Sequence, residues 1–108
     1  MIEVREYVDA NGHSLYRDWL VKRDAATIAR IIAAVLRVQS GNFSAAKPVG
    51  AGVSELRLDF GPGYRVYFGR DGERLVILLA GGTKKRQQAD IDAAKRLWAE
   101  YKRRKREE

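Results

Sequence analysis

The chain has 108 residues, no cysteine and one histidine, and its 21 Lys and Arg outnumber its 14 Asp and Glu, giving a formal net charge of +7. This length predicts one domain, residues 1–108, because domains cluster at about 100–150 residues. The composition excludes disulfides and thiolate metal sites, and no apolar run reaches the roughly 18 residues of a membrane-spanning helix. The N-terminus lacks a signal-peptide layout, so we expect a cytoplasmic protein with a polyanionic partner and no membrane association.

The first part of the chain predicts a strand and two helices. Residues 2–8 alternate apolar and polar side chains, as a half-buried strand does. A short helix begins near Ser14, and a second follows Asp24, a residue type that caps helix N-termini. The second helix has apolar residues at 3.6-residue spacing and stops at Ser40-Gly41-Asn42. Because only a few residues join the helices, they predict an antiparallel hairpin.

The rest of the chain predicts a loop, three strands and a helix. Residues 41–52 are rich in small side chains and indicate a loop. Two alternating segments, 53–60 and 64–68, indicate strands whose apolar residues, such as Leu56 and Val66, point to the core face. Asp71-Gly72 is a strong hairpin signal. The next strand, 75–80, is apolar throughout, which is typical of a strand covered on both faces.

A final segment with helical apolar spacing begins near Gln87. The order of elements is then β-α-α-β-β-β-α. This order predicts the α+β class, with an antiparallel-dominated sheet, an N-terminal helical hairpin and a C-terminal helix.

The positive charge is concentrated near the C-terminus. Residues 84–106 hold ten basic and three acidic residues, so this segment alone carries a charge of +7. Such a segment predicts a nucleic-acid partner, and the alternative is a solvated terminal helix. The basic residues that we select as candidate nucleic-acid contacts are Lys47, Arg86, Lys95, Lys102 and Arg103. Three more arginines, Arg23, Arg30 and Arg37, recur every seven residues along the second predicted helix.

Two arginines on the predicted sheet are candidates for phosphate binding. Arg57 and Arg65 lie on consecutive strands and on the same predicted face. A guanidinium suits phosphate because its fork of donors is planar and always charged. Tyr67 shares this face and offers a ring for stacking on a nucleobase.

Other charged residues would either add to this site or form ion pairs with its arginines. Lys84 and Lys85 follow the last strand and would join the two arginines if that face is open. The alternative is a set of surface ion pairs with Glu55 and Asp59, which would stabilise the fold little.

Metal-free RNA cleavage is compatible with these residues. In that reaction the ribose 2′-OH attacks the adjacent phosphate, a base removes its proton, an acid protonates the 5′ oxygen, and cations stabilise the added charge. A lysine crowded by arginines has a lowered pKa and can serve as the base. The single histidine and the scattered carboxylates predict no metal site, and we expect no cofactor.

Several segments together resemble a known family. They are Gly41-Asn42, the Val-Gly-Ala-Gly-Val-Ser-Glu-Leu-Arg of residues 49–57, the Gly-Pro-Gly-Tyr-Arg-Val-Tyr-Phe of residues 61–68 and the Leu-Leu-Ala-Gly-Gly-Thr-Lys of residues 78–84. They are similar to the RelE/ParE toxin superfamily, and within it to the HigB-like addiction module killer branch. The resemblance implies a type II toxin that cleaves mRNA on the ribosome without a metal. It also implies a cognate antitoxin, a small helix-turn-helix protein. The complex would bind operator DNA only through this antitoxin.

The resemblance also implies roles for particular residues. Arg65 resembles the arginine that binds the scissile phosphate, and Arg57 resembles a basic residue that contacts the RNA backbone. Lys84 or Lys85 takes the place of the cation after the last strand. Asp90 lies near the position of a catalytic tyrosine or acidic group in some relatives.

Two positions depart from the well-studied RelE nucleases. Those enzymes have a lysine where this chain has Glu55 and a late tyrosine where it has Asp90-Ile91. The phosphate-binding half of the pattern is therefore better matched than the proton-transfer half. The alternative functions are a ParE-like DNA gyrase inhibitor and a non-catalytic nucleic-acid-binding protein.

Overall fold

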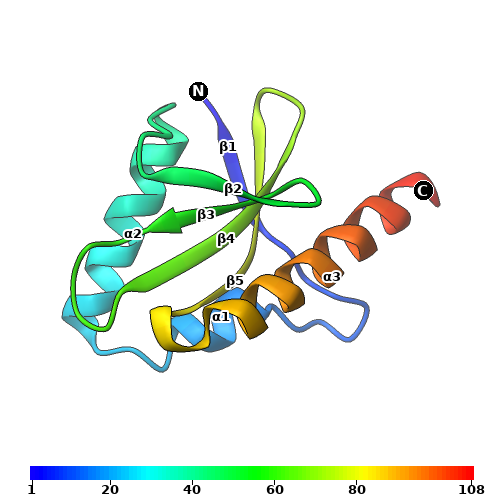
Figure 1. Cartoon of the computed structure of the whole chain (residues 1–108). Helices are drawn as coiled ribbons and strands as arrows, with labels where there is room; N and C mark the ends of the chain where they lie inside the picture. The colour runs from blue at the N-terminus through cyan, green and yellow to red at the C-terminus, as the bar shows by residue number, and fades with distance from the viewer.

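One five-stranded sheet organises the protein in the computed structural model, which describes residues 1–108. The elements in chain order are β1 (Glu3–Glu6), α1 (Leu15–Leu20), α2 (Ala25–Gln39), β2 (Ala46–Gly50), β3 (Val53–Arg57), β4 (Tyr64–Asp71), β5 (Leu75–Thr83), the short 3-10 helix η1 (Lys84–Arg86) and α3 (Gln87–Arg106) (Figure 1). The strand order across the sheet is β1-β5-β4-β3-β2, with β1 parallel to β5 and every other pair antiparallel. The predicted α+β class is therefore confirmed.

Strand β2 corrects the predicted order of elements. Its residues were expected to form a loop, yet they pair with β3 in a register that places Ala46 opposite Leu56 and Lys47 opposite Glu55. The sequence Ala-Lys-Pro-Val-Gly has little intrinsic strand preference, so alternation gave no signal. Pro48 is accommodated because β2 lies at the edge of the sheet and pairs on one side only.

The two N-terminal helices begin where their caps predict, and their expected antiparallel arrangement stays a prediction. The Ser14 hydroxyl accepts the Arg17 N–H, and the Asp24 carboxylate accepts the Thr27 N–H at 2.8 Å. The backbone of helix α1 lies close to β5. Tyr16 and Leu20 of α1 are buried in the same core cluster as Ile31 and Val35 of α2.

Helices cover both faces of the sheet (Figure 1). On one face, residues of α1 and α2 pack on alternate residues of the strands, such as Leu56, Val66 and Phe68. On the other face, α3 packs on the intervening residues, such as Ile77 and Leu79. The predicted core face and the double covering of β5 are both confirmed. No helix is long and apolar enough to cross a membrane.

Candidate anion-binding site

An open depression of about 520 Å³ lies where β3 and β4 meet the start of η1. Arg57, Arg65 and Lys84 line it together with the loop of residues 58–63. Arg57 and Arg65 are directly opposite each other in the β3–β4 register. The Lys84 N–H donates to the Gly63 carbonyl at 3.0 Å, which fixes η1 beside this loop. The structure thus brings together three of the cations selected from the sequence.

Arg65 differs from the exposed arginine that alternation suggested. Only 4% of it is exposed, and its Nε lies 3.4 Å from Glu55 Oε1. Its Nη1 donates to the Gly63 carbonyl at 2.9 Å and to the Tyr64 carbonyl at 3.3 Å. The Nη2 group donates no hydrogen bond within the protein, although Arg65 lines the depression. The guanidinium is therefore held along one edge and has Nη2 left for an anion.

Glu55 is the residue that holds Arg65, and it is completely buried. Its second carboxylate oxygen accepts a hydrogen bond of 2.6 Å from the Gln87 side chain, at the start of α3. Because no atom of Glu55 is exposed, it cannot contact an RNA backbone directly in this conformation. It is a positioning residue for Arg65, a role that the sequence did not distinguish from catalysis. Gln87 was not selected, because an amide at a helix start resembles any solvated polar residue.

Tyr67 cannot stack on a nucleobase in this structure, because its ring is fully buried under α3. The face that it shares with Arg65 was expected to be open, but α3 covers that face. The Tyr67 hydroxyl has no hydrogen-bond partner. Burial, followed by the negative charge of Glu55, raises the pKa of Tyr67 well above its ordinary value. Tyr67 therefore remains protonated.

Asp90 lies in a different hollow, of about 220 Å³, with Arg86 and Trp19. Its carboxylate occupies the space that a Cβ on Gly82 would fill, which explains the need for glycine there. Burial raises the pKa of Asp90, and the charge of Arg86 partly offsets this rise. Neither Asp90 nor Arg86 lines the depression, and Lys85 lines neither hollow.

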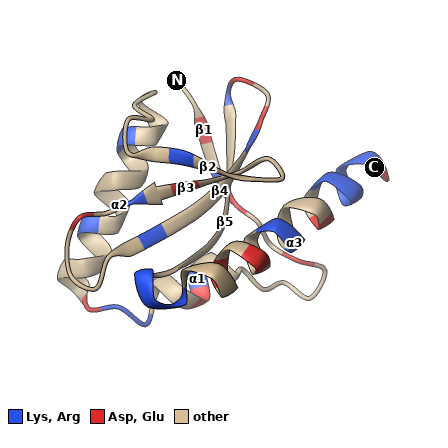
Figure 2. Ribbon diagram, in the orientation of Figure 1, with Lys and Arg blue, Asp and Glu red and all other residues tan.

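The other selected cations follow α3 and β2 rather than the depression. Lys47 is exposed on β2, and Lys95 lies over the β2–β3 turn at Gly50. The Lys102 ammonium is 5.8 Å from the Trp98 ring centre, and Arg103 pairs with Glu107 at 3.9 Å. Figure 2 shows this basic charge along the C-terminal part of α3.

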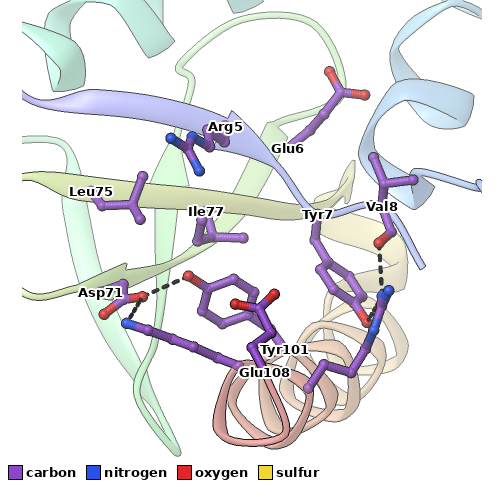
Figure 3. A pocket seen from close by; sticks show the side chains of 11 residues that line it. Arg5, Glu6, Tyr7, Val8, Asp71, Leu75, Ile77, Tyr101 and Glu108 are labelled. Carbon is purple, nitrogen blue, oxygen red and sulfur yellow. Dashed lines mark hydrogen bonds and ion pairs between the residues drawn. The ribbon is translucent and has the colours of Figure 1, made fainter. Parts of the chain in front are cut away.

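A third hollow, of about 390 Å³, separates the C-terminal half of α3 from β1 and β5 (Figure 3). Here Tyr101 and Lys105 both donate to Asp71 Oδ2 at 2.6 Å, and Arg104 donates to the Tyr7 hydroxyl at 2.9 Å. These bonds hold α3 on the sheet. They also occupy Arg104 and Lys105, so this hollow differs from the depression with its free donors.

The Asp71 network predicts a loss of stability in acid. The hydrogen bond from Lys105, and then that from Tyr101, lowers the pKa of Asp71. A carboxyl whose folded pKa is lowered stabilises the fold above its unfolded pKa of about 3.9 and loses this contribution as the pH falls below it. We expect Asp71→Asn to flatten the decline in melting temperature between roughly pH 5 and pH 2. The exposed Glu73→Gln is the control, and parallel curves for Asp71→Asn and wild type would contradict the prediction.

The fold and the depression together define a small basic α+β protein with a cationic cavity at the ends of two strands. No group of three or more His, Asp or Glu side chains is placed to hold a metal ion. Residues 18–99 match the family model described as phage-derived protein Gp49-like (DUF891). An uncharacterized protein of Haemophilus influenzae is 46% identical over 83 residues, which cover 76% of this chain and 84% of that protein.

The chain belongs to this Gp49-like family, which is a RelE/ParE-like toxin family of toxin–antitoxin systems. The resemblance noted in the sequence is therefore confirmed at the level of the superfamily. Membership supports the role of a toxin that is paired with an antitoxin.

Proposed function

We propose that this protein is a ribosome-dependent mRNA endonuclease of the HigB-like branch, which inhibits translation without a metal or cofactor. The observation that supports it best is the depression where Arg57, Arg65 and Lys84 converge with only one acidic residue, Asp59, in the lining. An RNA phosphate is the anion that such an open cavity of fixed cations suits.

The chemistry follows from where these cations lie. Arg65 Nη2 would bind a non-bridging oxygen of the scissile phosphate, while Arg57 and Lys84 offset the charge that builds as the 2′ oxygen attacks phosphorus. The 2′ proton passes to a base, and the leaving 5′ oxygen takes a proton from an acid, giving a 2′,3′-cyclic phosphate. Besides the two arginines, the ionisable side chains that line the depression are Lys84 and Asp59, whereas Glu55 is buried and Asp90 lies in another hollow.

Translating ribosomes loaded with a defined mRNA test the proposal. Wild-type protein should produce new mRNA 5′ ends, mapped by primer extension, and Arg57→Ala should slow their appearance about 100-fold, the effect of losing one group that stabilises the transition state. Arg57 is exposed and unpaired, so its loss should leave the fold intact. Arg74→Ala removes another exposed charge, from a residue that does not line the depression, and should cleave at the wild-type rate. The proposal would be contradicted if Arg57→Ala produced the same mRNA 5′ ends as the wild type at the same rate, or if the wild type produced no new ends.

The burial of Glu55 and Tyr67 favours a second candidate, a ParE-like inhibitor of DNA gyrase that binds without cleaving. It predicts inhibited supercoiling in a gyrase assay while mRNA on ribosomes remains intact. A non-catalytic nucleic-acid-binding protein predicts neither effect, and its overexpression should not arrest growth.

We propose that the protein acts in the cytoplasm and that a cognate antitoxin controls it. We propose a small helix-turn-helix antitoxin that masks the cationic depression with acidic or apolar segments and that alone carries the complex to operator DNA. Growth arrest by wild type, relieved when the adjacent reading frame is co-expressed, would support this partner.

A further inference from the structure

We propose a second RNA subsite, formed by Arg30 and Arg37 of α2 together with Arg57 of β3, which binds the strand beyond the phosphate held in the depression. This inference rests on the proposed function, since it extends the site of the same substrate. None of the α2 arginines belongs to the site described above.

A further hollow, of about 350 Å³, lies between α2 and the end of β3. Arg30, Ala33 and Arg37 line its α2 side. Its other side is formed by Ala45 and residues 57–60, and residues 57–60 also line the depression. The two hollows therefore adjoin one short segment, and Arg57 lines both. An extended chain that leaves the depression over this segment would enter the hollow.

No carboxylate pairs with the cations of this path. Arg30, Arg37 and Arg57 form no ion pair and donate no side-chain hydrogen bond; Asp59 is the one acidic residue that lines either hollow. By contrast, Arg17 pairs with Glu6 at 2.6 Å, and Lys105 pairs with Asp71 at 2.6 Å. Unpaired guanidinium groups that converge on a hollow repel each other, and a polyanion is the ligand that would relieve this repulsion.

Arg30 is also held in place by an aromatic ring. Its guanidinium carbon lies 3.7 Å from the centre of the Phe60 ring, and Phe60 packs on Tyr64 at 5.2 Å. A guanidinium stacked on one side presents its other side to a nucleobase and its edge to a phosphate. Arg23, the third arginine of the seven-residue series, lies 5.6 Å from the Trp19 ring and lines a different hollow. The subsite therefore uses two of the three arginines in this series, Arg30 and Arg37.

The geometry predicts how binding depends on RNA length. Seven residues of helix separate the backbones of Arg30 and Arg37 by about 10 Å, so each guanidinium can reach a phosphate of its own. A dinucleotide, which has one internal phosphate, would fill the depression alone. A longer single strand would reach Arg30 and Arg37 as well.

Fluorescence anisotropy with 2′-O-methyl RNA tests this path without cleavage, because the attacking hydroxyl is blocked. For an octanucleotide at 150 mM salt we expect Arg30→Gln/Arg37→Gln to weaken binding about 10-fold. A plot of the logarithm of the association constant against the logarithm of the salt concentration should become less steep by roughly 1.4, since each phosphate contact to a single strand contributes about 0.7 to the slope. Dinucleotide binding should change less than twofold. Lys22→Gln/Arg74→Gln removes the same charge from residues outside both hollows and should leave octanucleotide binding within twofold of wild type.

Equal losses in the two double variants would overturn the subsite, because net charge alone would then explain them. Unchanged RNA binding by Arg30→Gln/Arg37→Gln, with reduced capture of the co-expressed antitoxin, would also overturn it and assign the groove to protein docking. Both outcomes are independent of cleavage, which the ribosome assay measures. A protein that cleaves mRNA but lacks this subsite is thus distinguishable from one that binds RNA along the path but does not cleave.

Discussion

Replacing Arg65 by alanine is expected to lower the free energy of unfolding by about 3–5 kcal/mol and to abolish growth inhibition. The first effect arises because Glu55 is fully buried and Arg65 is the only cation within ion-pair distance of its carboxylate. Removing the guanidinium leaves a buried negative charge whose hydrogen bond from Gln87 does not neutralise it. The second effect arises because Arg65 carries the free Nη2 of the depression.

The two effects are separated by neutralising both partners. In Glu55→Gln/Arg65→Met no charge is buried, and the new amide still accepts from Gln87, so at least half of the lost stability should return. Growth inhibition should remain absent, because methionine donates nothing to a phosphate. Urea denaturation of each purified variant gives the stability, and induction from a tight promoter gives the growth phenotype. If the stable double variant arrests growth like the wild type, Arg65 acts only in folding.

The sequence predicted which side chains share a face more reliably than what covers that face. Alternation placed Leu56 and Val66 on one side and Arg57 and Arg65 on the other, as the structure has them. It could not show that α3 lies over the second side, because that docking depends on residues of α3 that contact both β4 and β5. For the same reason Tyr67 was expected to be a stacking platform and is instead part of the core.

The candidate site was predictable only where it depends on local chemistry. Arg57 and Lys84 are exposed, so their residue types alone describe what they offer a ligand. Arg65 depends on Glu55 and on the carbonyl of Gly63, contacts fixed by strand register and by the path of a loop. Asp90 follows Lys84 by less than two helical turns, yet it lines another hollow. Such placements need the whole fold.

The packing of α3 on the sheet predicts a large and specific coupling between Gly69 and Trp98. A Cβ on Gly69 would lie 2.5 Å from Trp98 Cε3, well inside van der Waals contact, and Trp98 is itself 95% buried and stacked on Tyr101 at 5.1 Å. Because the indole cannot move without displacing Tyr101, Gly69→Ala is expected to lower the free energy of unfolding by about 3 kcal/mol. Trp98→Phe should cost a similar amount by leaving a cavity.

A double-mutant cycle shows whether the losses of stability in the two single variants arise from the same contact. The smaller ring of Trp98→Phe makes room for the new methyl group, so Gly69→Ala/Trp98→Phe should be more stable than the sum of the single losses by at least 1 kcal/mol, a coupling typical of residues in contact. Additive losses in urea denaturation would contradict this contact. The same cycle reports on function, because α3 supplies Gln87 to Glu55, which in turn holds Arg65. A loosened α3 should therefore weaken growth inhibition in both single variants, and the double variant should regain part of it.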